Sequence, residues 1–115
     1  MQNAAKEFFD RHAADMDKVK AQAPEAMQVV REMYQKLMKD GALTAREKEL
    51  VALGMAIALR CHPCIYAHVK RSLGMGITKE QVLEVAQVAV VMQGGPGYMY
   101  MPVVTDAIEA CATEG

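Results

Sequence analysis

The chain has 115 residues and a formal net charge of -1, with 52% hydrophobic and 23% charged residues. This length suits a single domain spanning 1–115, and the balanced charge gives no basic field for nucleic acid or an anionic membrane. No apolar run approaches the roughly 20 residues of a membrane span, and the N-terminus shows no signal-peptide core, so we expect a cytoplasmic protein with no membrane partner.

Helix signals dominate the chain, and no stretch alternates like a half-buried strand. We therefore predict an all-α bundle of five to six helices, beginning with an N-terminal helical arm over residues 1–22. Pro24 suits the first turn of a second helix, and "KDG" at 39–41 predicts that this helix ends with Gly41 as its left-handed cap.

Two capping boxes predict the starts of later helices. Thr44 with Glu47 opens a helix to about Leu59, which is apolar nearly all round from residue 50 onward and is therefore expected at the centre of the bundle. Thr78 with Gln81 opens another helix, which the break "GGPG" at 94–97 ends. A final helix is predicted from about residue 98 to residue 112.

The stretch "RCHPC" at 60–64 interrupts the apolar helix. It contains two cysteines, and a histidine follows at residue 68. Because Pro63 fits only the first turn of a new helix, Cys61 is expected at or near a helix N-terminus. Steps of three and four residues then place Cys64 and His68 on one face with it. Helix ends and neighbouring histidines favour thiolates, so this spacing offers a nucleophile, a second thiol and a base.

Other chemistries are open for the same residues. A thioredoxin-like site would follow a strand, whereas here a capped helix precedes the motif. Haem attachment would need a histidine directly after the second cysteine, but Ile65 stands there. Zinc needs four ligands, and His62, between the cysteines, converges poorly with both of them, while Cys111 is distant in sequence. We therefore expect no metal and no cofactor. His12, in a polar segment, is expected to be solvated.

One carboxylate upstream of the motif has no capping role. Glu49 begins an otherwise apolar run, twelve residues before Cys61. Glu47, by contrast, is explained as the partner of Thr44 in the capping box. A partly buried carboxylate at residue 49 could shuttle protons, although helical phase alone does not direct it toward the cysteines.

Together, these residues indicate a resemblance to a known protein family. The stretch "LTAREKELVALGMAIALRCHPCIYAHVKRSLGMGITKEQVLEVAQVAV" resembles the carboxymuconolactone decarboxylase family, and most closely its alkylhydroperoxidase D-like branch. That branch is marked by a glutamate, twelve residues and then Cys-x-x-Cys-x-x-x-His, which Glu49, Cys61, Cys64 and His68 match. The resemblance covers about residues 24–110. It implies an all-α fold and a homo-oligomer, a trimer or a hexamer, which agrees with the apolar surplus.

The resemblance also implies a mechanism of peroxiredoxin type. Cys64 attacks a small hydroperoxide, Cys61 resolves the product as a disulfide, and Glu49 and His68 form the proton relay. An external dithiol, possibly of lipoyl type, reduces the pair. Reasoning from the helix end alone favours Cys61 as the more acidic thiol, so the order of attack stays open.

Two other functions fit parts of the sequence. The family name suggests a lactone decarboxylase, which would need no redox dithiol. A non-catalytic oligomeric redox sensor would form the disulfide without cycling it, and it would use the apolar and methionine-rich surface to assemble.

Overall fold

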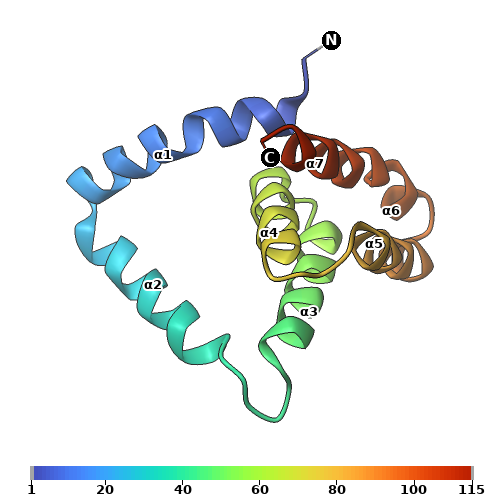
Figure 1. The fold of residues 1–115 in the computed structure, drawn as a ribbon, viewed down its shortest axis with the longest axis horizontal. Helices are drawn as coiled ribbons and strands as arrows, with labels where there is room; N and C mark the ends of the chain where they lie inside the picture. Colours follow the sequence, from blue (N-terminus) through green and yellow to red (C-terminus); the bar gives the residue numbers. More distant parts are fainter. Residues whose placement is uncertain (1, 115) are drawn as a thin grey trace.

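The computed structural model describes residues 2–114, and every element in that range is helical (Figure 1). The prediction of an all-α fold is confirmed. Six helices have 13 to 19 residues, and a seventh has five. The helices are α1 (Ala4–Gln22), α2 (Pro24–Leu37), α3 (Ala45–Ala58), α4 (His62–Gly74), α5 (Lys79–Gln93), α6 (Gly95–Met99) and α7 (Met101–Glu114).

The core lies among α3, α4, α5 and α7. Helices α3 and α4 form an antiparallel hairpin, against which α5 packs from the α3 side and α7 from the α4 side (Figure 1). The fully buried side chains of this core are mostly branched aliphatic residues from all four helices, with small alanines between them. They include Leu53, Ile57, Ile65, Val82 and Val104.

Helices α1 and α2 form a bent arm beside this core (Figure 1). The start of α1 is tied to α7, because the Asn3 amide donates to the Asp106 carbonyl at 2.9 Å while its oxygen caps α1. Helix α2 packs chiefly against α1 and buries none of its residues. The arm therefore leaves an amphipathic helix largely uncovered.

The predicted left-handed cap at Gly41 is wrong. Helix α2 ends at Leu37 with Met38 as its cap residue, and Gly41 has no positive φ. The side chain of Lys48 explains this ending, because its Nζ donates to the carbonyls of Leu37 and Lys39 at 2.9 and 2.6 Å. A cation from α3 thus satisfies helix-end carbonyls that a glycine turn would otherwise serve.

Both predicted capping boxes are present, with Thr44 and Thr78 each accepting from the backbone three residues on. The break after α5 is also present, at Gly94, where φ is +65°. The last long helix, however, begins at residue 101 and not at about 98, because Tyr98 belongs to the short helix α6. Pro96 starts that short helix and Pro102 starts α7, so each proline occupies a first turn.

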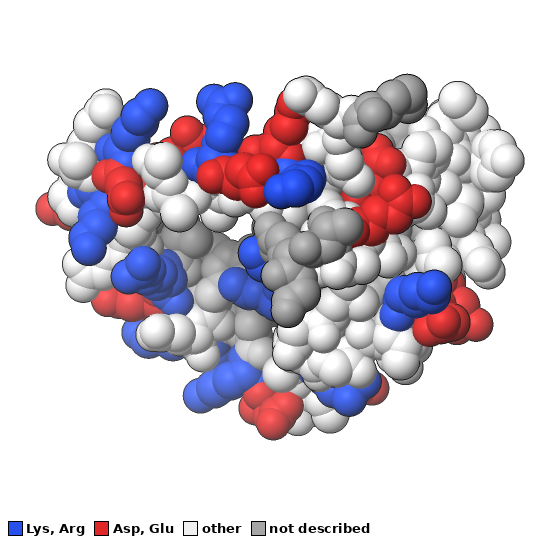
Figure 2. All heavy atoms as spheres, turned by 45° about the horizontal axis from the view of Figure 1, so that its top comes forward, with Lys and Arg blue, Asp and Glu red and all other residues white. Residues whose placement is uncertain are grey.

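Helix α3 is only partly central. Its inner face contributes Leu53 and Ile57 to the core, but Val51, Met55 and the cap residue Leu59 are exposed. Figure 2 shows charges of both signs along the arm and few charged side chains on the side formed by α5 and α6. No helix in the described range is both long enough and apolar enough to cross a bilayer.

Candidate active site

The site begins at the tight turn between α3 and α4. Arg60 has a φ of +57°, in the left-handed region that non-glycine residues rarely adopt, and this turn reverses the chain between the two helices. Cys61 then caps α4: its Sγ accepts the backbone N–H of Cys64 at 3.3 Å. Pro63 lies in the first turn, as predicted.

Cys61 and Cys64 are joined by a disulfide, with Cα atoms 5.2 Å apart. That separation lies within the ordinary range for disulfides. Cys64 is exposed and Cys61 is half-buried. The pair is therefore accessible to small molecules, chiefly at the second cysteine. Cys111, on α7, lies outside this disulfide.

The structure brings Glu49 and His68 together across the α3–α4 hairpin. Their shortest contact joins His68 Nδ1 and Glu49 Oε1 at 2.9 Å, with Oε2 at 3.2 Å. Glu49 is 1% exposed, and the His68 side chain is 14% exposed. A buried carboxylate needs a polar partner, and the imidazole supplies it. Because Nδ1 is committed to Glu49, Nε2 is the ring nitrogen left for other groups.

His68 follows Cys64 by one turn of α4, so their side chains share a face of the helix. The four residues singled out from the sequence thus lie along the α3–α4 hairpin, with the cysteines at the turn and Glu49 and His68 further from it. Glu49 holds the imidazole, the imidazole neighbours Cys64, and Cys64 is linked to Cys61. This arrangement can exchange disulfides and can move a proton to or from a sulfur.

An aromatic cluster on the other side of the motif was not foreseen. The ring of His62 lies 5.3 Å from that of Tyr100, and its Nδ1 lies 3.4 Å from the Tyr66 hydroxyl. Burial raises the pKa of Tyr66, and the negative charge of Asp106 raises it further. The spacing of four between residues 62 and 66 signals their contact, but nothing local in the sequence places Tyr100 beside them.

Within residues 2–114, no group of three or more histidine, cysteine, aspartate or glutamate side chains is arranged to hold a metal ion. The disulfide occupies both sulfurs of the motif in this structure.

Two sequence relatives are similar to part of this chain. A protein of Cupriavidus necator without a described function is 36% identical over 77 residues, which are 67% of this chain and 68% of the relative. An alkyl hydroperoxide reductase AhpD of Corynebacterium kroppenstedtii is 44% identical over 46 residues. That match spans 40% of this chain and only 26% of the relative.

The fold has a solved counterpart. The crystal structure of a carboxymuconolactone decarboxylase family protein from Legionella pneumophila superposes with a TM-score of 0.82, covers 97% of both chains and is 31% identical. The sequence model of the carboxymuconolactone decarboxylase family matches residues 24–106. These matches confirm the resemblance seen in the sequence, and the chain belongs to the carboxymuconolactone decarboxylase family.

Proposed function

We propose that the protein is a thiol-dependent oxidoreductase that reduces alkyl hydroperoxides through Cys61 and Cys64. The observation that carries this proposal is the hydrogen bond between the buried Glu49 and His68, one helical turn from Cys64. A purely structural disulfide needs no such partner. The likeness to an alkyl hydroperoxide reductase over 46 residues supports the same function.

The proposed cycle starts from the dithiol. The Cys64 thiolate attacks a hydroperoxide oxygen, the O–O bond breaks, and the alcohol leaves with a proton supplied through His68. Cys64 is then a sulfenic acid. The Cys61 sulfur attacks it, which forms the S–S bond and releases water. The net change is ROOH plus two thiols to ROH, water and a disulfide.

A dithiol of lipoyl type would complete the cycle. One of its sulfurs attacks Cys64, which is the more exposed sulfur of the pair, and Cys61 leaves as the thiolate. The backbone N–H that Cys61 accepts at the start of α4 stabilises this leaving thiolate. The second sulfur of the reductant then displaces Cys64, which restores the reduced pair.

The working form is proposed to be a homo-oligomer, a trimer or a hexamer. Large exposed apolar side chains support this assembly, and they lie on α2, α3 and α5. Because α3 also carries Glu49, contacts between copies along this helix would stiffen the element that holds His68.

The test is peroxide turnover with dihydrolipoamide as the reductant. The parent protein is expected to reduce cumene hydroperoxide continuously, and Cys64→Ser is expected to lose at least a hundredfold in rate. Cys61→Ser should stop cycling after one equivalent. Cys111→Ser is the matched control and should retain the parent rate, because it lies outside the disulfide.

The same assay separates the two alternatives. A redox sensor would oxidise with one equivalent of peroxide but would not turn over with any dithiol. A lactone decarboxylase would convert its lactone even with both motif cysteines replaced. Absence of turnover with several hydroperoxides and dithiols would reject the proposal.

A further inference from the structure

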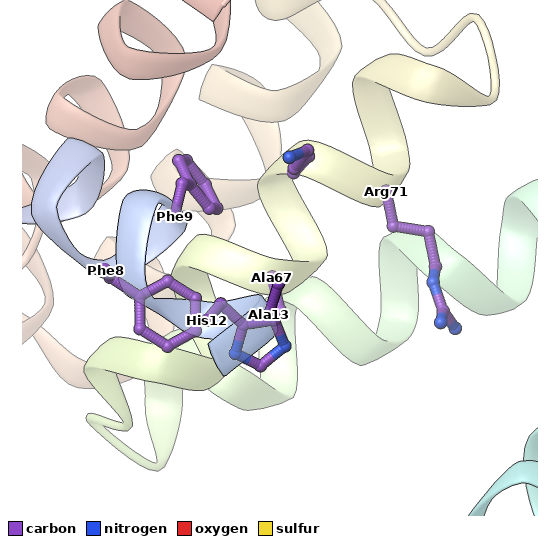
Figure 3. A pocket seen from close by; sticks show the side chains of 7 residues that line it. Phe8, Phe9, His12, Ala13, Ala67 and Arg71 are labelled. Atoms are coloured by element: carbon purple, nitrogen blue, oxygen red, sulfur yellow. The ribbon is translucent and has the colours of Figure 1, made fainter. Parts of the chain in front are cut away.

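A second feature lies along α4, beyond Cys64 on the side away from Glu49. A pocket of about 410 Å³ opens between α1 and α4. Figure 3 shows Phe8 and His12 of α1 beside Ala67 of α4, with Arg71 further along α4. His12, expected to be solvated, therefore lines a pocket, and its ring packs 4.8 Å from that of Phe8.

The lining of the pocket is apolar with a cationic end. Phe8, Phe9 and two alanines supply the apolar part, and Lys70 and Arg71 supply the charge. No aspartate or glutamate lines it among the described residues. Pockets for small molecules typically combine an apolar wall with a few polar groups that fix orientation.

Both cations are held against aromatic rings. The Lys70 ammonium lies 4.9 Å from the centre of the Phe9 ring, and the Arg71 guanidinium lies 4.7 Å from that of Tyr34 on α2. Arg71 makes no ion pair with a carboxylate in the part of the chain that the structure describes. Stacking positions a guanidinium while leaving its edge N–H groups directed outward, where they suit a carboxylate.

The helix relates this pocket to the disulfide. Ala67 and His68 follow Cys64 by three and four residues, so they lie on either side of the line that runs down the helix from Cys64. His68, which contacts Glu49, therefore lies on one side of that line, and Ala67, which lines the pocket, lies on the other. Arg71 follows Cys64 by seven residues, which is a rise of about 10 Å at 1.5 Å per residue.

We propose that this pocket binds an amphipathic carboxylate, and that the hydroperoxide substrate is of this class. Its carboxylate pairs with Arg71, its chain lies on Phe8 and Ala67, and its peroxide group reaches Cys64, which lies two turns before Arg71 on α4. A fatty-acid hydroperoxide has this form. The substrate assignment rests on the proposed peroxidase function, whereas binding of the carboxylate does not.

Binding is tested first, without turnover. Decanoate, below its micelle concentration, and the neutral decanol are titrated into the full protein by calorimetry. Decanoate is expected to bind more tightly than decanol. The Arg71→Gln substitution should lower the affinity for decanoate about tenfold. Arg11→Gln removes the same charge from α1 outside the pocket lining and should leave both affinities unchanged. Equal affinities for decanoate and decanol would overturn the proposal.

Turnover is tested next, with linoleate hydroperoxide and its methyl ester. The parent is expected to favour the acid by about tenfold in kcat/KM, and Arg71→Gln should reduce this preference to about one. If the protein reduced the acid and the methyl ester hydroperoxides at equal rates, the substrate assignment would be wrong, but the peroxidase function would still be supported. Charge-dependent binding of decanoate with no reduction of either hydroperoxide would reject the peroxidase function and support the pocket.

The reductant is a second source of the same chemistry, because dihydrolipoate is also an amphipathic carboxylate. The rate of hydroperoxide reduction with dihydrolipoate is therefore compared with the rate with dihydrolipoamide, which lacks the carboxylate. If Arg71→Gln slows only the acid form of the reductant and leaves the preference between the two hydroperoxides intact, the pocket serves the reductant and the substrate assignment is wrong.

Discussion

At the scale of single residues, the contact between Glu49 and His68 separates this Cys-x-x-Cys pair from an ordinary disulfide. A 1%-exposed carboxylate is costly to bury and is kept by its bonds to the imidazole. The contact also fixes which ring nitrogen faces the carboxylate. The imidazole is therefore oriented before any substrate arrives, and orientation of this kind contributes to general acid–base catalysis.

Replacing Glu49 by glutamine tests this role. Glutamine keeps the shape but replaces the carboxylate that contacts the imidazole, so proton transfer between His68 and Cys64 should be impaired. We expect alkylation of reduced Cys64 by iodoacetamide at neutral pH to slow about tenfold, followed by mass spectrometry of the peptide. Glu47→Gln is the matched control, because it is exposed and glutamine also serves in a capping box. Equal alkylation rates in parent and Glu49→Gln would contradict the relay.

The sequence predicted this residue pattern in two steps: helical spacing grouped the two cysteines with His68, and the family resemblance added Glu49. Spacing alone places Cys61, Cys64 and His68 on one face of a helix. It does not place Glu49, because the angle between α3 and α4 depends on a turn in which Arg60 has a positive φ. That conformation is uncommon for arginine and has no local signal. The partnership of His62 with Tyr100 likewise depends on tertiary packing.

At the scale of helices, local sequence signals predicted a helix start correctly where the capping residue directly precedes the helix. Thr44 and Thr78 begin α3 and α5 because each satisfies a backbone N–H within three residues. The prediction failed at the end of α2, because the carbonyls there are satisfied by Lys48, from another helix. A cap supplied from a distance cannot be recognised by a local pattern.

The contact between α5 and α6 gives a prediction at this scale. Gly97 is buried, and a Cβ added there would lie 2.7 Å from the Ala89 carbonyl oxygen and 3.0 Å from the Cα of Val90. Since both are backbone atoms, α6 would have to move away from α5. Gly97→Ala should lower the free energy of unfolding by about 1–3 kcal/mol, measured with urea at a fixed protein concentration.

Gly95→Ala is the control for that measurement. It lies in the same short helix, and an added Cβ there meets no atom within 4 Å. It should therefore change stability much less than Gly97→Ala does. Similar midpoints for the two variants would show that the close approach of α6 to α5 does not contribute to stability.

At the scale of the whole molecule, composition already indicated more apolar residues than a single small domain can bury. The structure locates the surplus: Val51 and Met55 on α3, Leu59 directly after it, and Val88 and Val91 on α5 are all more than half exposed. Helices α3 and α5 pack together, and each carries exposed apolar side chains. Patches of this kind mark association surfaces.

Met55 is the position at which to test association, because it is 62% exposed and lies in the middle of the exposed row on α3. A lysine there would place a charge in the proposed interface, where it would lack a partner. We expect Met55→Lys to weaken self-association at least tenfold, observed by sedimentation as a shift toward the monomer. Ala14→Lys adds the same charge to an exposed position of α1, outside this region, and should sediment like the parent. A parent that is monomeric at every concentration, or a Met55→Lys variant that keeps the parent's mass, would show that this surface does not join copies of the chain.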